Sequence, residues 1–363
     1  MKVAGRICAA CVTGLLGAPS FADDKTDAAL IKAIAAVDSY ANEAVTWNGF
    51  DGVLVIEQGG KRLYGKAFGP ADRDENIPIT LETPFLIASQ GKMFTAVAVL
   101  QLVEAGKVKL DDPVGTYLRG YHNREVAEKV TIRHLLTHRG GTGDMGILQR
   151  EETDNRAIVR SIDDLLRLNG SRPPAFEPGS KFDYSNYGFI LLGAVVERVS
   201  GQSYYDYIEE HVFRPAGMQH SGFPTLDQMQ GVAIGYTWVE KELKPSTEWL
   251  PWRGTPAGGG ISTAEDLVRF FAALNAGKLI SKEMLAEATR RQPNWGLGFV
   301  SSPPDEFPHW GHGGGAPGNS LIADYHPKAD LNFVCLSNLD PPACDHMAWK
   351  LFEALAPAYG VKL

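Results

Sequence analysis

A serine followed three residues later by a lysine stands at the start of a long apolar segment. Ser89 and Lys92 precede residues 93–103, which are apolar on nearly every face and so predict a helix buried all round. Residues i and i+3 share one face of a helix, where an amine can accept the proton of a nucleophilic hydroxyl. Burial disfavours the charged ammonium, and the helix N-terminus favours a developing anion. This pair therefore indicates nucleophilic catalysis.

A structural interpretation of the same pair is also open. Ser89 could only cap the helix, and Lys92 could extend its side chain towards solvent. An isolated S-x-x-K pattern is expected about once by chance in a chain of this length. Few lysines open a continuous apolar helix, however, and this position favours the catalytic interpretation.

Two later segments place polar groups where a turn meets a regular element. Tyr184 and Asn186 precede an apolar helix expected at 189–199, and His312 precedes three glycines at 313–315. Glycines allow a backbone to approach a ligand closely. Taken alone, Tyr184 fits a packed aromatic residue with a satisfied hydroxyl, and His312 could be a structural polar group at a strand.

Two histidines raise the question of a metal site. His134 and His138 are spaced i, i+4 in a short helix expected at 131–138. No glutamate follows His134 and no third ligand is evident in the sequence. The pattern therefore favours a structural role for both residues, and we expect neither a metal nor another cofactor.

The surrounding pattern predicts an α/β fold of the α+β type. One antiparallel sheet is expected from both chain ends, about 45–88 and 290–363, with a large helical insertion at about 89–289. The expected strands are 52–58, 62–68, 295–300, 319–325 and 331–338, and the expected outer helices are 27–45 and 347–355. The polar segment 140–155 is expected to form a loop over a site.

The N-terminus has the features of a signal peptide. Lys2 and Arg6 precede a mildly apolar stretch at 7–16, and Ser20-Phe21-Ala22 resembles a cleavage site. We expect cleavage after Ala22, export to the periplasm or medium, and one hydrolase domain at 23–363. An ordinary cytosolic N-terminus and lipid attachment at Cys11 are the alternatives.

Composition and charge limit the kinds of partner that the protein is expected to bind. A hydrophobic content of 44% and a charged content of 21% are ordinary for a soluble globular protein. Loss of Lys2 and Arg6 would change the net charge from −8 to −10, because residues 1–22 contain no acidic residue. Such a charge argues against binding nucleic acid or inserting into a membrane after signal cleavage. Cys335 and Cys344 would remain and could pair, although the strand pattern around Cys335 slightly favours a free buried thiol.

The order and spacing of the polar segments resemble a known superfamily. Ser89–Lys92, Tyr184–Asn186 and His312–Gly314 are similar to the S-x-x-K, Y-x-N and K-T-G motifs of serine beta-lactamases and penicillin-recognising hydrolases. The chain looks most like the branch with class C beta-lactamases, D-alanyl-D-alanine carboxypeptidases, D-aminopeptidases and esterases. The short sequence motifs at 135–138, 176–179 and 258–263 support a resemblance to this branch. The resemblance covers roughly the whole mature chain and implies a beta-lactamase-like fold.

The resemblance also implies roles for single residues. Ser89 corresponds to the acylated nucleophile, Lys92 to its proton acceptor, and Tyr184 to the relay to the leaving group. Asn186 would orient Lys92 and the substrate, and the backbone amides of Ser89 and Gly315 would form the oxyanion hole.

The third motif departs from the family pattern. His312 and Gly313 replace a lysine and a threonine that hold a substrate carboxylate in many penicillin-binding enzymes, although His312, Gly313 and Gly314 would still border the substrate. Histidine is mostly neutral near pH 7.5 and binds an anion more weakly. We therefore expect short-chain esters to be better substrates than penicillins, with any beta-lactam activity rising as the pH falls through the His312 pKa. Trp295 and Trp310 are expected to offer apolar surface to the acyl chain.

The favoured function is an exported serine hydrolase that acts through an acyl-enzyme at Ser89 on a small ester, amide or D-peptide. A D-alanyl-D-alanine carboxypeptidase or a class C-like beta-lactamase is the enzymatic alternative. A non-catalytic protein that binds cell-wall fragments is the alternative of another class, and a metal-dependent hydrolase is the least supported. The sequence leaves the natural substrate and the oligomeric state open.

Overall fold

The computed structural model describes residues 24–143, 158–292 and 295–363. The signal peptide expected at 1–22 and most of the loop expected at 140–155 lie outside these residues. Within them, no helix combines the length and the apolar character that crossing a membrane requires.

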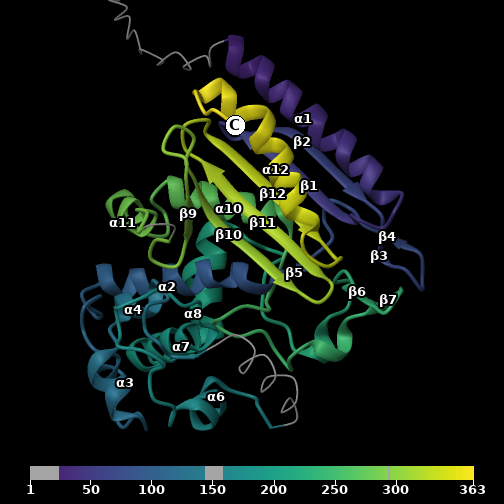
Figure 1. Ribbon diagram of the computed structural model, residues 1–363. Helices are drawn as coiled ribbons and strands as arrows, with labels where there is room; N and C mark the ends of the chain where they lie inside the picture. The colour runs from purple at the N-terminus through teal and green to yellow at the C-terminus, as the bar shows by residue number, and fades with distance from the viewer. Residues whose placement is uncertain (1–23, 144–157, 293–294) are drawn as a thin grey trace, which may run out of the picture.

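A six-stranded antiparallel sheet forms the centre of the fold (Figure 1). Its strand order is β2-β1-β12-β11-β10-β9. The strands are β1 Gly52–Gln58, β2 Lys61–Phe68, β9 Val300–Ser302, β10 His309–Ala316, β11 Asn319–His326 and β12 Leu331–Ser337. The pairing of β1 with β12, in which Val55 lies opposite Val334, joins the two ends of the chain. The predicted sheet made from both chain ends is therefore confirmed.

Both faces of this sheet are covered. Helices α1 (Asp24–Val45) and α12 (Ala343–Leu355) lie side by side on one face (Figure 1), and α10 (Ala264–Asn275) contacts the strands from the other. Side chains alternate between faces along a strand, so Leu54 and Ile56 pack with α1 and α12, while Val53 and Val55 pack with the helical region. This double burial explains why β1 and β12 are apolar at nearly every position.

A disulfide links Cys335 in β12 to Cys344 in α12, with the two Cα atoms 5.6 Å apart. The slight preference for a free thiol was therefore wrong. Helix α12 begins at Ala343, one turn before the expected start at Met347, and this turn holds Cys344 over the sheet face to which Cys335 points. Both cysteines are fully buried.

The helical region is organised around α2 (Gly91–Glu104), which is buried over most of its surface. It contacts α7 and α8, and Gly106 follows it in a left-handed conformation with φ of 69°. Among the residues that the structure describes, the other α-helices are α3 Arg124–Lys129, α4 Ile132–Leu136, α6 Ile162–Asn169, α7 Asn186–Ser200, α8 Tyr204–Ile208, α9 Arg214–Ala216 and α11 Lys282–Ala288. Short strands pair as β3 Pro70–Asp72 with β4 Ile77–Pro78, β5 Phe85–Leu86 with β8 Ile261–Ser262, and β6 Tyr236–Val239 with β7 Glu242–Pro245.

The prediction of a strand at 295–300 is wrong. Trp295 and Val300 form an isolated bridge across a turn, and β9 begins only at Val300. Gly298 adopts a φ of 83°, and a Cβ atom there would overlap the side chain of Ala96 in α2. The glycine is needed for close packing of this turn on α2, which a strand pattern does not reveal.

Candidate active site

Ser89 lies in a 3-10 turn, Ala88–Gln90, that leads directly into α2. Ala88 adopts a φ of 42°, an unfavourable conformation for a residue with a side chain. The residue at the cap position of α2 is Gln90, and no side chain caps the helix. The capping interpretation of Ser89 is therefore wrong, and its hydroxyl is available for other contacts.

Lys92 is fully buried and its Nζ atom lies 3.2 Å from Ser89 Oγ. The amine also donates to Asn186 Oδ1 at 2.7 Å and to the backbone oxygen of Ala257. A neutral amine has two N–H groups. If these point to the two carbonyl oxygens, the lone pair faces Ser89 Oγ, which is the arrangement that a proton acceptor needs.

Tyr184 completes the group around Ser89. Its side chain is hydrogen-bonded to that of Ser89, and Lys92 Nζ lies 4.9 Å from the centre of its ring. Burial raises the pKa of Tyr184 above its ordinary value, and the hydrogen bond to Ser89 opposes this effect. Tyr184 is therefore a neutral phenol at ordinary pH, able to donate a proton and accept one in the same step.

His138 holds the Tyr184 ring in place. The two rings stack with centroids 4.2 Å apart, and His138 Nδ1 accepts the Ser185 backbone N–H at 3.0 Å. Helix α4 ends at Leu136 and His138 has a φ of 54°, so His134 and His138 do not share a helix face as expected. His134 instead contacts the backbone of Thr131 at the start of α4. Burial lowers the pKa of His138 well below its ordinary value and keeps it neutral.

The glycines after His312 bring one edge of the sheet against Ser89. Strand β10 pairs with β9 over His309–Gly311, and beyond this its edge lies along the turn that carries Ser89. A Cβ atom at Gly314 would lie 2.8 Å from the backbone oxygen of Ile87, so only glycine allows this approach. Gly315 and Ser89 line the same cavity, where their backbone amides are the candidate oxyanion donors.

His312 is more buried than the sequence led us to expect. It is only 3% exposed, its Nδ1 contacts the backbone oxygen of Gly313, and its ring lies 5.4 Å from that of Trp295. Burial lowers the pKa of His312 to about 3. The expectation that His312 changes charge near pH 6.5 is therefore wrong, because desolvation suppresses the imidazolium.

This correction changes the expected pH dependence. His312 stays neutral between pH 8 and 5, so lowering the pH over this range adds no positive charge beside a substrate carboxylate. We expect the pH profiles of kcat/KM for a penicillin to have the same shape in the wild type and in His312→Gln. His346→Gln, which changes an exposed histidine, serves as the control. An acidic limb near pH 6.5 that disappears only in His312→Gln would contradict the structure.

The expected role of Trp310 is also wrong. Its side chain is buried in the core, where it packs against Phe271 and Phe299. Trp295 lies closer to the site, with its ring 5.6 Å from that of Tyr184. Neither tryptophan lines the cavity beside Ser89.

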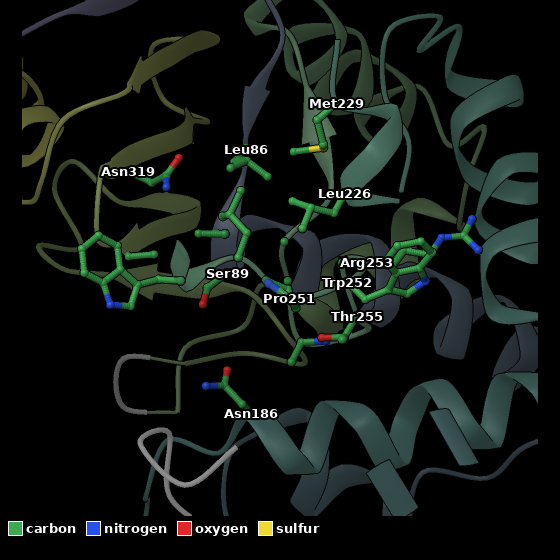
Figure 2. A pocket seen from close by; sticks show the side chains of 18 of the residues that line it. Leu86, Ser89, Asn186, Leu226, Met229, Pro251, Trp252, Arg253, Thr255 and Asn319 are labelled. Carbon is green, nitrogen blue, oxygen red and sulfur yellow. The ribbon is translucent and has the colours of Figure 1, made fainter. Parts of the chain in front are cut away.

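That cavity has a volume of about 130 Å³ and opens beside Ser89 and Asn186 (Figure 2). Two segments that sequence reasoning missed form much of its wall, 224–229 and 249–254. Trp249 ends a short 3-10 turn, and Pro251 and Trp252 follow it before a glycine-rich turn. Such clustered aromatic residues in a connecting segment were the available signal.

Comparison with known proteins agrees with this geometry. Residues 37–357 match the Beta-lactamase protein family. The chain is 31% identical over 296 residues to penicillin-binding protein PbpX of Bacillus subtilis, covering 80% of this chain and 71% of PbpX. It is 31% identical over 297 residues to esterase EstB of Burkholderia gladioli, covering 70% of this chain and 75% of EstB.

A solved structure supports the same assignment. The crystal structure of a penicillin-binding protein from Bacillus halodurans superimposes with a TM-score of 0.76 at 32% identity, covering 86% of this chain and 98% of that protein. The family match spans most of the chain, and the predicted resemblance and fold are confirmed. The chain therefore belongs to the Beta-lactamase family of serine hydrolases, which includes penicillin-binding proteins and esterases.

Proposed function

We propose that this protein hydrolyses small neutral esters through an acyl-enzyme formed at Ser89. The observation that carries the proposal is the contact of 3.2 Å between Lys92 Nζ and Ser89 Oγ in a buried setting beside an open cavity. A protein that only binds cell-wall fragments has no need to bury a lysine against a serine hydroxyl, since burial of an amine is costly.

Acylation begins with transfer of the Ser89 proton to neutral Lys92. The freed Oγ attacks the ester carbonyl, and the backbone N–H groups of Ser89 and Gly315 stabilise the oxyanion. Collapse of this intermediate breaks the bond to the leaving alkoxide. Tyr184 gives its proton to the alkoxide and recovers one from Lys92, so an alcohol leaves and the amine is neutral again.

Deacylation repeats these steps with water. A water molecule attacks the acyl carbonyl and gives one proton to Tyr184, which passes its own phenol proton to Lys92. The second oxyanion uses the same two backbone donors. Its collapse breaks the bond to Ser89 Oγ and releases a carboxylic acid, while Lys92 gives its extra proton to Ser89 Oγ and restores the hydroxyl. Each residue thus returns to its starting state.

The preference for neutral esters rests on the charges near Ser89. His312 is a neutral imidazole in place of a lysine, so a carboxylate on the substrate loses one charge-assisted hydrogen bond. The similarity to EstB is consistent with an esterase, whereas the similarity to PbpX keeps penicillin or D-peptide hydrolysis as the second candidate. Export by cleavage after Ala22 remains part of the proposal and rests on residues 1–22 alone.

A fluorophosphonate probe tests the proposal directly. We expect one probe to add to the wild-type protein, at the peptide that contains Ser89, and hydrolysis of p-nitrophenyl butyrate to be lost in Ser89→Ala. Ser171→Ala, at an exposed serine, should label normally. Unchanged labelling or activity in Ser89→Ala would remove Ser89 from the mechanism. A higher kcat/KM for penicillin G than for the ester would favour the second candidate.

A further inference from the structure

The cavity beside Ser89 has mainly apolar walls. Leu86 lies next to the turn that carries Ser89, and Leu226, Met229, Pro251 and Trp252 also line the cavity (Figure 2). We propose that this cavity binds the acyl group of the substrate and buries a part of it about the size of one benzene ring. This inference rests on the proposed acyl-enzyme at Ser89.

The side chains around the cavity favour a neutral occupant over an anionic one. Among the described residues that line it, Arg253 is the one charged side chain. Arg253 Nε donates to the backbone oxygen of Phe223 at 2.6 Å, and its guanidinium carbon lies 3.6 Å from the centre of the Tyr205 ring. Arg253 is therefore already engaged, and Figure 2 shows it extending away from Ser89. The remaining polar side chains, which include Asn186, are neutral.

The position of Tyr184 assigns the occupant to the acyl side of the scissile bond. The leaving oxygen must meet the proton of Tyr184, which contacts Ser89 but does not line the cavity. A group in the cavity therefore lies away from the proton donor. That group is the one that remains attached to Ser89 after the alcohol departs.

The volume sets the size of the buried part. An apolar cavity of about 150 Å³ in another protein holds one benzene molecule. The cavity here measures about 130 Å³. It should therefore accept an acyl chain of about four to six carbon atoms or a benzoyl group, and longer chains should lose the benefit of burial.

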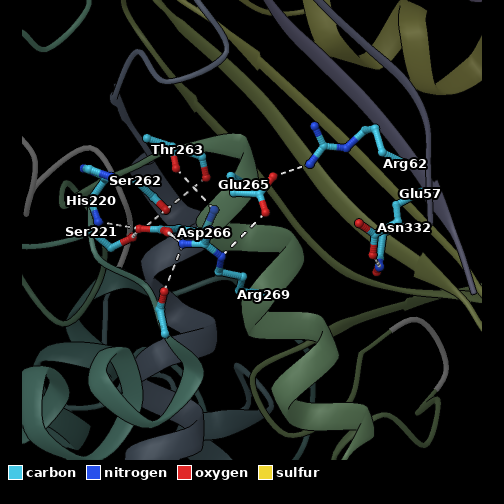
Figure 3. Close-up of polar contacts among 11 residues, drawn as sticks. Glu57, Arg62, His220, Ser221, Ser262, Thr263, Glu265, Asp266, Arg269 and Asn332 are labelled. Atoms are coloured by element: carbon cyan, nitrogen blue, oxygen red, sulfur yellow. Dashed lines mark hydrogen bonds and ion pairs between the residues drawn. The ribbon is translucent and has the colours of Figure 1, made fainter. Parts of the chain in front are cut away.

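The wall is held by polar contacts rather than left to form around a ligand. Leu226 N donates to the backbone oxygen of Trp252 at 2.8 Å, which joins the two wall segments. His220 and Ser221 lie just upstream of the first wall segment. Asp266, which is fully buried in α10, accepts the His220 backbone N–H at 2.7 Å and the Ser221 hydroxyl at 2.8 Å (Figure 3). These contacts fix the chain just before the first wall segment. A pre-formed wall cannot expand cheaply, so acyl carbon atoms beyond the cavity volume gain no further burial.

Two ester series test the assignment in the full-length protein. In p-nitrophenyl esters the acyl chain grows from acetyl to dodecanoyl, whereas in alkyl acetates only the alcohol grows. We expect wild-type kcat/KM to peak at about four to six acyl carbons, following the cavity volume. Leu226→Trp should lower the rate with hexanoate at least about tenfold relative to acetate, because a filled pocket rejects added methylenes. Trp252→Ala should shift the peak to longer acyl chains.

One control variant and two opposing outcomes complete this test. Trp349→Ala, at an exposed tryptophan of α12, should leave both profiles unchanged. The inference is overturned if both cavity variants keep the wild-type acyl profile, or if they alter the alkyl acetate profile instead. Failure of the proposed function has another signature, since Ser89 would then not be acylated or Ser89→Ala would remain active. Absence of ester hydrolysis in the wild type would overturn both.

Discussion

Replacing Lys92 with methionine is expected to slow acylation of Ser89 by about 10²- to 10⁴-fold, the usual cost of losing a general base. The Lys92 amine lies 3.2 Å from Ser89 Oγ, and Asn186 Oδ1 together with the Ala257 backbone oxygen directs its remaining bonds. Methionine preserves an apolar stem of similar length but cannot accept a proton. A single-turnover measurement with p-nitrophenyl butyrate reports this step without interference from deacylation.

The fold of the variant needs its own check, because loss of the amine leaves two buried carbonyl oxygens without that donor. Thermal unfolding should therefore accompany the kinetics. Lys107→Met, at an exposed lysine just after the same helix, should acylate at the wild-type rate. Lys92→Arg is a second variant for the same test. It should also acylate slowly, because arginine keeps the positive charge but does not give up its proton. Acylation at the wild-type rate in a folded Lys92→Met protein would exclude Lys92 as the base.

Replacing Gly258 with valine is expected to lower kcat/KM by about 10²-fold or more, because small displacements of reacting groups have costs of that size. Gly258 has a φ of 144°, and a Cβ atom there would overlap the backbone oxygen of Ala88 and lie 3.1 Å from Ser89 N. The neighbouring Gly259 N–H donates to the same Ala88 oxygen at 3.1 Å. A side chain at position 258 must therefore move the turn that carries Ser89.

Gly222→Ala is the matched control. A Cβ atom at Gly222 meets nothing within 4 Å, and its backbone conformation suits any residue. We expect wild-type activity in Gly222→Ala, and slow labelling of Ser89 by a fluorophosphonate in Gly258→Val. Normal labelling and turnover in Gly258→Val would show that the glycine-rich turn does not position Ser89.

The parts of the fold that the sequence predicted are those with strong local patterns. The continuous apolar segment after Lys92 predicted a buried helix, and α2 is that helix. Apolar runs at 52–58 and 331–338 predicted buried strands, and β1 and β12 pair with each other. Motif spacing singled out Ser89, Lys92, Tyr184 and Asn186. In the structure Lys92 contacts Ser89 and Asn186, and Tyr184 contacts Ser89.

The features that the sequence did not predict depend on contacts between distant segments. The Ala257 backbone oxygen binds Lys92, but every residue has such an oxygen and no side chain marks it. Burial lowers the pKa of His312. How deeply this side chain is buried is visible only once the sheet and α2 are assembled. The Trp295 turn depends on how closely Gly298 approaches Ala96.

The pairing of β1 with β12 also fixes when the sheet can be completed during synthesis. Residues 52–58 need residues 331–337 as neighbours. At elongation rates of about 5–20 residues per second, β1 waits roughly 15 to 55 s for that partner. Over this interval β2 can cover only one of its two edges, and the other edge exposes an apolar strand that can pair with foreign chains. The nascent protein therefore depends on being kept apart from other unfolded chains until its last strands emerge.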